Sequence, residues 1–190
     1  IGVRGIGAFF GFGLMALASR LDPRFSLTIA FSLQGIAGLY MASFNIDMTF
    51  SQVAWAGIIQ GIGVGMAWVP ISVLTFSTLD KRYFGEGTAM YHLIRNVASS
   101  FFISITVAVV LHTGQISFGN LSSLVTDWNM GLALNFTDQF IENFDQVTIK
   151  NLTSEVNRQS LMIGYINSFM LFAIVSFLTI PFLFLIKEKK

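Results

Sequence analysis

Five long apolar runs constrain this 190-residue chain more than any other feature. Crossing the hydrocarbon core of a bilayer takes about 20 helical residues, each rising about 1.5 Å. The runs cover residues 1–18, 25–44, 53–76, 88–111 and 161–186. Their only charged side chains are Arg4 and Arg95. We therefore expect an all-α membrane protein with five transmembrane helices.

The composition excludes several other classes. Charged residues make up 11% of the chain, against about 25% in a typical soluble domain. The chain has no cysteine, so disulfides and cysteine-based metal sites cannot form. A net charge of +1 gives no reason to expect a nucleic-acid partner. The apolar runs contain no histidine cluster or paired carboxylates, so we expect no catalytic residues, no metal, no cofactor and no enzyme activity.

Basic residues in the connections predict the orientation in the membrane. Seven of them would face one side: Arg20, Arg24, Lys81, Arg82, Lys187, Lys189 and Lys190. The connections on the other side contain two, Lys150 and Arg158. Because cytoplasmic loops are enriched in Lys and Arg, we expect the amino end outside and the carboxy tail in the cytoplasm.

The long connection at residues 113–159 precedes the last helix and tail at residues 160–190. It is acidic and hydrated, and seven apolar residues recur in it at near-helical spacing: Met130, Leu134, Phe136, Phe140, Ile141, Phe144 and Val147. This spacing predicts an amphipathic helix within an extracytoplasmic loop. The helix would either cover the outer mouth or membrane surface, or provide a docking surface for an extracytoplasmic partner.

The third run contains a glycine ridge. Gly57, Gly61 and Gly65 lie four residues apart, which permits close packing by a neighbouring helix. Gln60 lies beside the ridge. Either the ridge serves helix packing alone, or Gln60 also faces a substrate cavity. Pro70 in the same run should bend the helix, because proline lacks the backbone N–H of a helical hydrogen bond.

The fourth run contains a polar stripe. On a helix, five of its polar residues fall within one arc: His92, Arg95, Asn96, Ser99 and Thr106. Such a stripe must face protein or water. Arg95 would either extend toward the inner headgroups and backbone carbonyls or line a transport path. His92 would be either a hydrogen-bonded polar residue or a proton carrier.

All ten acidic residues lie outside the five runs. A proton-coupled transporter needs a carboxylate within the membrane that changes its protonation state. If the protein uses protons, we expect that carboxylate in another part of a longer chain.

A resemblance to a known family follows from several short motifs in order. They are Arg4-Gly5, Arg20-Leu21-Asp22-Pro23-Arg24, Gln60-Gly61 with Pro70, Phe76-Ser77-Thr78-Leu79, Arg95-Asn96 and Asn157-Arg158-Gln159-Ser160-Leu161. Together they resemble the carboxy-terminal half of the fourteen-span drug:proton antiporters of the EmrB/QacA type in the major facilitator superfamily, with EmrB-like members the most similar. The resemblance covers nearly the whole chain.

This resemblance implies a fragment of a multidrug efflux transporter in the bacterial inner membrane. Such proteins export hydrophobic or cationic small molecules in exchange for protons, by alternating access between two halves. The implied partners are the lipid bilayer, the missing amino-terminal half, a periplasmic adaptor protein and an outer-membrane channel. By position, Arg20, Asp22 and Arg24 would belong to a cytoplasmic gate, and Arg95 with Asn96 to the polar stripe.

Two other functions remain open. The chain could belong to a facilitator with another substrate, such as a siderophore, a lipid or a sugar. It could also be a non-transporting membrane subunit or a truncated gene product. The apolar runs favour a hydrophobic cargo over a sugar, which needs many hydrogen bonds.

Overall fold

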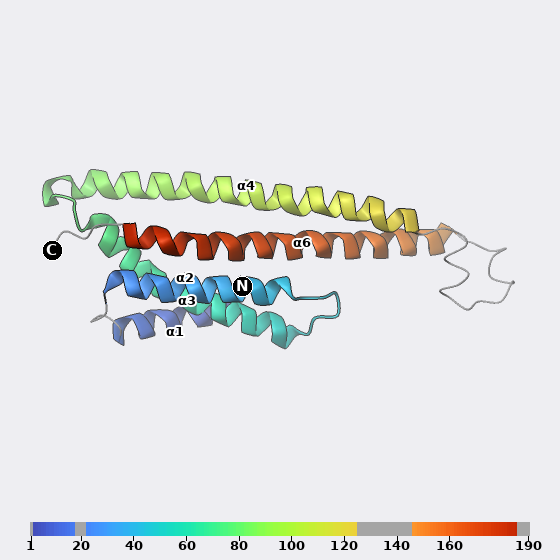
Figure 1. The fold of residues 1–190 in the computed structure, drawn as a ribbon, viewed down its shortest axis with the longest axis horizontal. Helices are drawn as coiled ribbons and strands as arrows, with labels where there is room; N and C mark the ends of the chain where they lie inside the picture. The colour runs from blue at the N-terminus through green and yellow to red at the C-terminus, as the bar shows by residue number, and fades with distance from the viewer. Residues whose placement is uncertain (1, 18–21, 125–145, 186–190) are drawn as a thin grey trace. The chain divides into compact units, whose positions relative to one another are not determined.

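The computed structural model describes residues 2–17, 22–124 and 146–185, and these residues form helices without a strand. The α-helices, labelled as in Figure 1, are α1 (Gly2–Leu17), α2 (Pro23–Ala42), α3 (Phe50–Phe76), α4 (Phe84–Leu124) and α6 (Gln146–Leu185). A short 3₁₀ helix, η1 (Lys81–Tyr83), precedes α4. The prediction of an all-α protein is confirmed.

Four of these helices, α2, α3, α4 and α6, are long and apolar enough to cross a membrane, and α1 is a shorter apolar helix. Their outward surfaces carry large apolar side chains, with Phe9 77% and Phe101 69% exposed. Lipid suits such surfaces, and a helix satisfies its own backbone hydrogen bonds there. The chain is a multi-pass membrane protein.

The chain divides into two compact units. Unit 1 comprises Ile1–Ser104 and Phe169–Lys190, and unit 2 comprises Ile105–Ser168. Unit 1 thus contains α1, α2, α3, the first half of α4 and the last part of α6. Unit 2 contains the remainder of α4 and the first part of α6.

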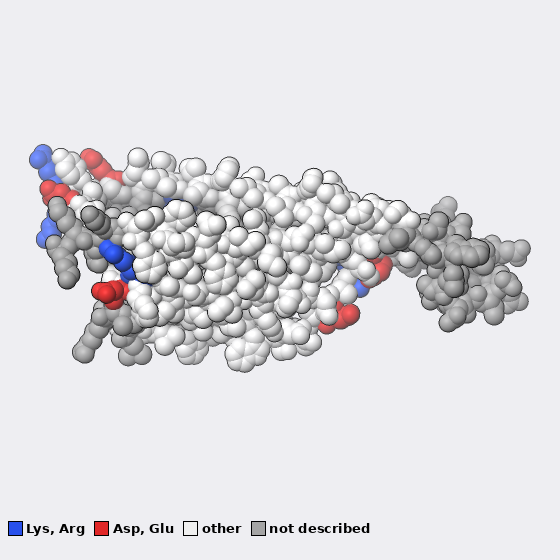
Figure 2. All heavy atoms as spheres, viewed as in Figure 1, with Lys and Arg blue, Asp and Glu red and all other residues white. Residues whose placement is uncertain are grey.

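In unit 1, α3 packs against both α1 and α2. The buried core joins side chains from α2, α3 and the end of α6: Leu27, Ala30, Met66, Ala67, Leu74 and Leu183. Figure 1 shows that α1 and α3 end, and α2 and α4 begin, at the same end of this unit. In Figure 2 the surface over α1 to α3 is uncharged except close to the helix ends. An uncharged band between charged ends is the pattern that a bilayer requires.

Glycines bring α1 and α3 into backbone contact. A Cβ atom added at Gly61 would collide with the carbonyl oxygen of Arg4, and one added at Gly65 with that of Ala8. Glycines on α1 make the reciprocal approach, because a Cβ atom at Gly7 would collide with the backbone of Ile58. Both helices therefore present small residues four positions apart, as in close-packed membrane helices.

Gly57 and Pro70, also expected from the sequence to affect the packing of α3, have surroundings that differ from those of Gly61 and Gly65. A Cβ atom added at Gly57 would be 3.8 Å from the backbone nitrogen of Arg4, which is ordinary contact. Pro70 lies inside α3 and is buried. Its missing N–H leaves the carbonyl one turn earlier, that of Met66, without its usual donor.

In unit 2 the two helix segments also pack through small residues. Gly164 lies against the backbone of Val110, and the Ser168 hydroxyl donates to the Thr106 carbonyl at 3.3 Å. Ser160, one turn before Gly164, is also buried. A serine or glycine at every fourth position of α6 therefore forms the contact with α4.

The helix limits differ from the limits of the apolar runs. The predicted fourth span ends at residue 111 and the predicted loop occupies residues 113–159, but α4 continues to Leu124 and α6 begins at Gln146. Hydropathy reports where a helix is apolar enough to meet lipid, and the helical backbone continues beyond that point in both elements. The predicted amphipathic helix lies mostly at residues 125–145, outside the described residues.

We predict that substitutions at two neighbouring glycines of α3 differ in their effect. Gly61→Ala should lower the free energy of unfolding by about 1–3 kcal/mol, because its methyl group displaces the backbone of α1. Gly57→Ala, the matched control, should change it by less than about 1 kcal/mol. Unfolding of both variants in mixed detergent micelles measures this difference. Equal stabilities would contradict the close contact.

A second pair of glycines tests the packing of unit 2. Gly164→Ala should lower the free energy of local opening by about 1–3 kcal/mol, because the added methyl group meets the Val110 backbone. Gly119→Ala should have little effect, since no other group lies within 4 Å of its added Cβ. Amide hydrogen exchange of residues 105–124 reports the opening. Unchanged exchange in Gly164→Ala would mean that these segments do not pack as described.

Candidate functional site

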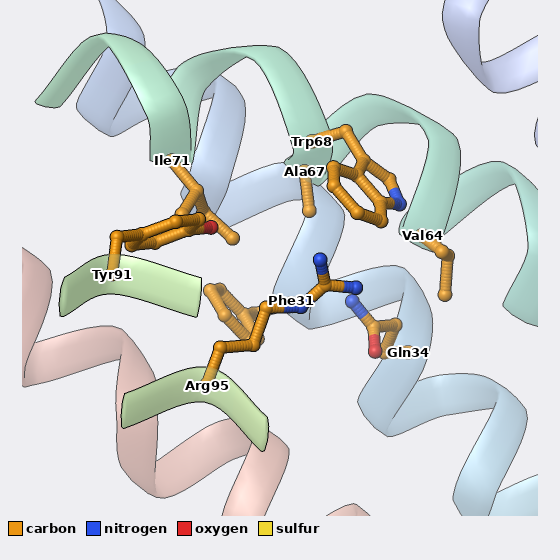
Figure 3. Close-up of a pocket in the computed structure, with 8 residues that line it drawn as sticks. All are labelled: Phe31, Gln34, Val64, Ala67, Trp68, Ile71, Tyr91 and Arg95. Atoms are coloured by element: carbon orange, nitrogen blue, oxygen red, sulfur yellow. The ribbon is translucent and has the colours of Figure 1, made fainter. Parts of the chain in front are cut away.

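The candidate site is a cavity of about 220 Å³ within unit 1. Three helices line it, as Figure 3 shows. Its lining residues are Phe31 and Gln34 from α2, Val64, Ala67, Trp68 and Ile71 from α3, and Tyr91 and Arg95 from α4. Pockets that enclose a drug-sized ligand usually measure about 300–1,000 Å³. This cavity can therefore hold part of such a ligand.

Helical periodicity brings these residues together. The four residues of α3 follow the spacing i, i+3, i+4, i+7, and the pairs on α2 and α4 lie three and four residues apart. Residues at these spacings share one face of a helix. Each helix thus contributes a single stripe to the cavity.

A cation–π contact organises the polar part of the cavity. The central guanidinium carbon of Arg95 lies 4.1 Å from the centroid of the Trp68 ring. Such contacts contribute about 0.5–1 kcal/mol at exposed sites and about 2 kcal/mol when desolvated. Figure 3 shows the Arg95 side chain reaching from α4 to a position between Trp68 and Gln34. The contact therefore fixes where the positive charge lies.

Aromatic rings support the α4 side of the cavity. The Tyr91 ring makes an edge contact with Phe76, with centroids 5.6 Å apart. It makes a second edge contact with His92 at 5.5 Å. Rings at these separations attract one another beyond their burial. Tyr91 is thereby held at the cavity, one helical turn before Arg95.

The cavity carries positive charge without a compensating carboxylate. Arg95 is the only ionisable side chain of its lining apart from the Tyr91 phenol. No acidic side chain of the described residues forms an ion pair with Arg95. The remaining lining is apolar except for the Gln34 carboxamide and the Trp68 indole N–H. The described lining can therefore donate hydrogen bonds from Arg95, Gln34 and Trp68.

The residues proposed for the substrate path divide into two groups. Arg95 lines this cavity, whereas Gln60, His92, Asn96 and Ser99 do not. Gln60 is half-buried on α3, and the other three are exposed on α4. The backbone carbonyl of Asn96 accepts a hydrogen bond from the Ser100 hydroxyl at 3.0 Å. The exposed polar stripe therefore has room for a further partner.

The residues proposed for the cytoplasmic gate lie at the start of α2. Arg20 is outside the described residues. Asp22 is exposed, and its backbone carbonyl accepts hydrogen bonds from the amides of Phe25 and Ser26 at 3.0 and 3.2 Å. Arg24 is half-buried, and its Nε is buried and has no hydrogen-bond partner among the described residues. No ion pair joins Asp22 to Arg24 in the described part of the chain.

Gln34, Trp68 and Tyr91 are functional candidates that the sequence reasoning missed. A signal was present for Gln34, the one carboxamide in the run at residues 25–44. Trp68 and Tyr91 resemble any aromatic residue of a lipid-facing helix until their neighbours are known. No group of three or more metal-ligating side chains occurs within the described ranges.

The chain is similar in sequence to several export and resistance proteins. The multidrug export protein EmrB of Haemophilus influenzae is 24% identical over 149 residues, covering 76% of this chain and 29% of the relative. The Escherichia coli K12 protein of the same name is 26% identical over 113 residues, covering 59% and 22%. The fatty acid resistance protein FarB of Neisseria gonorrhoeae is 20% identical over 172 residues, covering 89% and 34%.

No family model matches the chain, and no solved structure matches it. The chain spans about a third or less of the length of the curated relatives it matches. Two features nevertheless agree with this similarity to membrane export proteins. They are the ordered motifs along nearly the whole sequence and the long apolar helices that can cross a membrane. The chain is thus similar in sequence to multidrug export proteins named EmrB from several bacteria.

Proposed function

We propose that the chain is part of a secondary active multidrug efflux transporter, which exports hydrophobic small molecules in exchange for protons by alternating access. The similarity to export and resistance proteins over 76–89% of the chain supports this most strongly. The cavity in unit 1 adds a physical reason, because apolar residues with a few polar groups are typical of small-molecule sites. Cationic cargo, also implied by the family resemblance, would need a carboxylate from elsewhere in the transporter.

In this proposal the chain supplies one wall of a larger cavity. The chain corresponds to spans two to six of the carboxy-terminal half of the transporter. The amino-terminal half covers the exposed polar stripe of α4. His92, Asn96 and Ser99 are exposed within a helix whose apolar window has no buried residue. Polar groups in that position are stabilised by facing protein or water. Gln60 lies outside the cavity of unit 1 and would join the substrate path as part of the wall of this larger cavity.

The proposed orientation places the amino end outside and the tail in the cytoplasm of the bacterial inner membrane. In unit 1, Arg24, Lys81 and Arg82 belong to the helix ends that Figure 1 draws together. This clustering supports a cytoplasmic assignment for that end. Asp22 and Arg24 would form part of the cytoplasmic gate at this end, together with Arg20, which lies outside the described residues.

The proton-coupling carboxylate lies outside these spans in this account, because no acidic residue occurs in the five apolar runs.

Unit 2 takes a separate role. Helix α4 has 41 residues and would be about 60 Å long at 1.5 Å per residue, about twice the thickness of the hydrocarbon core. The excess length supports an extracytoplasmic projection that contacts a periplasmic adaptor and, through it, an outer-membrane channel.

Transport by the full-length protein tests the proposed function. In everted membrane vesicles with an imposed proton gradient, the intact transporter should accumulate a neutral hydrophobic dye, and a protonophore should abolish the accumulation. Vesicles without the transporter provide the control. Absence of gradient-driven accumulation for a panel of hydrophobic compounds would favour a non-transporting membrane subunit. Accumulation limited to a sugar or a siderophore would favour a facilitator with another substrate.

A further inference from the structure

A buried hydroxyl group on α2 has no partner within the part of the chain that the structure describes. Ser26 is fully buried, and its Oγ forms no hydrogen bond with a described residue. Other hydroxyls that are buried or partly buried donate to the carbonyl one turn earlier in their own helix, as at Thr28, Ser160 and Ser176. Buried polar groups are nearly always paired, so the exception at Ser26 needs a physical reason.

The carbonyl that Ser26 would normally use is already occupied. This carbonyl belongs to Asp22, the N-cap residue of α2. It accepts hydrogen bonds from the backbone amides of Phe25 and Ser26 at 3.0 and 3.2 Å. A carbonyl oxygen has two lone pairs, so these two amides use its acceptor capacity. The Ser26 hydroxyl therefore needs an acceptor from another helix.

A suitable acceptor is available on α3, the helix that packs against α2. Pro70 is fully buried inside α3. Because proline has no backbone N–H, the carbonyl of Met66, one turn earlier, lacks its usual helical donor. Met66 is itself buried. The interior of unit 1 thus contains a donor without an acceptor and an acceptor without its usual donor.

Contacts between α2 and α3 place these two groups at the same level. A Cβ atom added at Gly63 would lie 2.9 Å from the carbonyl oxygen of Ala30. The two helices are antiparallel, since α2 begins at the end where α3 finishes (Figure 1). Ser26 lies one turn before Ala30 on the same face of α2, and Met66 lies about one turn after Gly63. Leu27, the neighbour of Ser26, packs in the same core as Met66.

We propose that Ser26 is a positioning residue for α3, whose hydroxyl donates to the Met66 carbonyl when the transporter changes conformation and so supplies the hydrogen bond that Pro70 cannot. The inference rests on the proposed export function, because it requires the second conformation of alternating access. In the described conformation the unpaired hydroxyl is unfavourable. A small shift of α3 at its proline allows the bond to form. The pair therefore favours the other conformation.

A double-mutant cycle in the purified full-length transporter tests the proposal. One spin label is placed at Thr78, which is exposed just after α3, and a second at the cytoplasmic end of the amino-terminal half. The distance distribution between the two labels in nanodiscs gives the population ratio of the two conformations. Ser26→Ala should change this ratio about fivefold or more, because it removes the hydrogen bond from one conformation and the unpaired hydroxyl from the other.

Pro70→Ala provides the second side of the cycle. It restores an N–H group to the Met66 carbonyl, so the native hydroxyl is no longer the donor that this carbonyl needs. Pro70→Ala should therefore shift the population ratio in the same direction as Ser26→Ala. In the Pro70→Ala background, Ser26→Ala should change the ratio by less than about twofold. Such coupling is expected only if the two residues act on one hydrogen bond.

A matched serine controls for the general loss of a buried hydroxyl. Ser176 is also buried in unit 1, but its hydroxyl donates to the Phe172 carbonyl of its own helix at 2.8 Å. Ser176→Ala should change the population ratio by less than about twofold, with or without Pro70→Ala. An equal shift in Ser176→Ala and Ser26→Ala would overturn the proposal.

The remaining outcomes separate this inference from the proposed function. If two conformations are present and the effects of Ser26→Ala and Pro70→Ala simply add, the inference is wrong and the export function is unaffected. A single conformation under all conditions would reject alternating access and the inference together. If the two substitutions are coupled but the vesicles show no gradient-driven dye accumulation, export is rejected and the role of Ser26 stands.

Discussion

The backbone contact between α1 and α3 is the constraint on which unit 1 depends. In lipid, helices gain little from burying apolar side chains against each other, so association relies on close packing. Gly61 and Gly65 bring α3 against the carbonyl oxygens of Arg4 and Ala8, and larger side chains would hold the helices apart. Since α3 also packs on α2, its position fixes one side of the cavity.

The cavity follows from that arrangement. Ala67 and Trp68 are neighbours on α3. Ala67 packs in the core, and the Trp68 ring makes the cation–π contact with Arg95. An arginine in a membrane helix is stabilised when protein groups take up its charge and its hydrogen bonds. Here an aromatic face takes part of that role without neutralising the charge. The result is a cation held beside apolar side chains.

The packing of unit 2 extends the same principle beyond the length of a membrane span. Ser160, Gly164 and Ser168 let α6 approach α4 closely, and a hydroxyl-to-carbonyl bond at Thr106 adds to the contact. Glu155 lies outside the apolar run, and its carboxylate accepts hydrogen bonds from Arg158 and Gln159. The helices therefore continue into a polar segment that hydropathy alone would assign to a loop.

The sequence by itself determined the helical membrane class, because uncharged runs of span length have no other stable form in lipid. It also placed Arg95 on a polar stripe, since helical spacing is a local property. Tertiary structure alone decided that Trp68 and Gln34 meet Arg95 and that Gly7 is opposite Ile58, because these contacts join residues far apart in the chain. The ends of α4 and α6 likewise came only from the structure, since apolar composition stops at the lipid boundary and hydrogen-bonded helix does not.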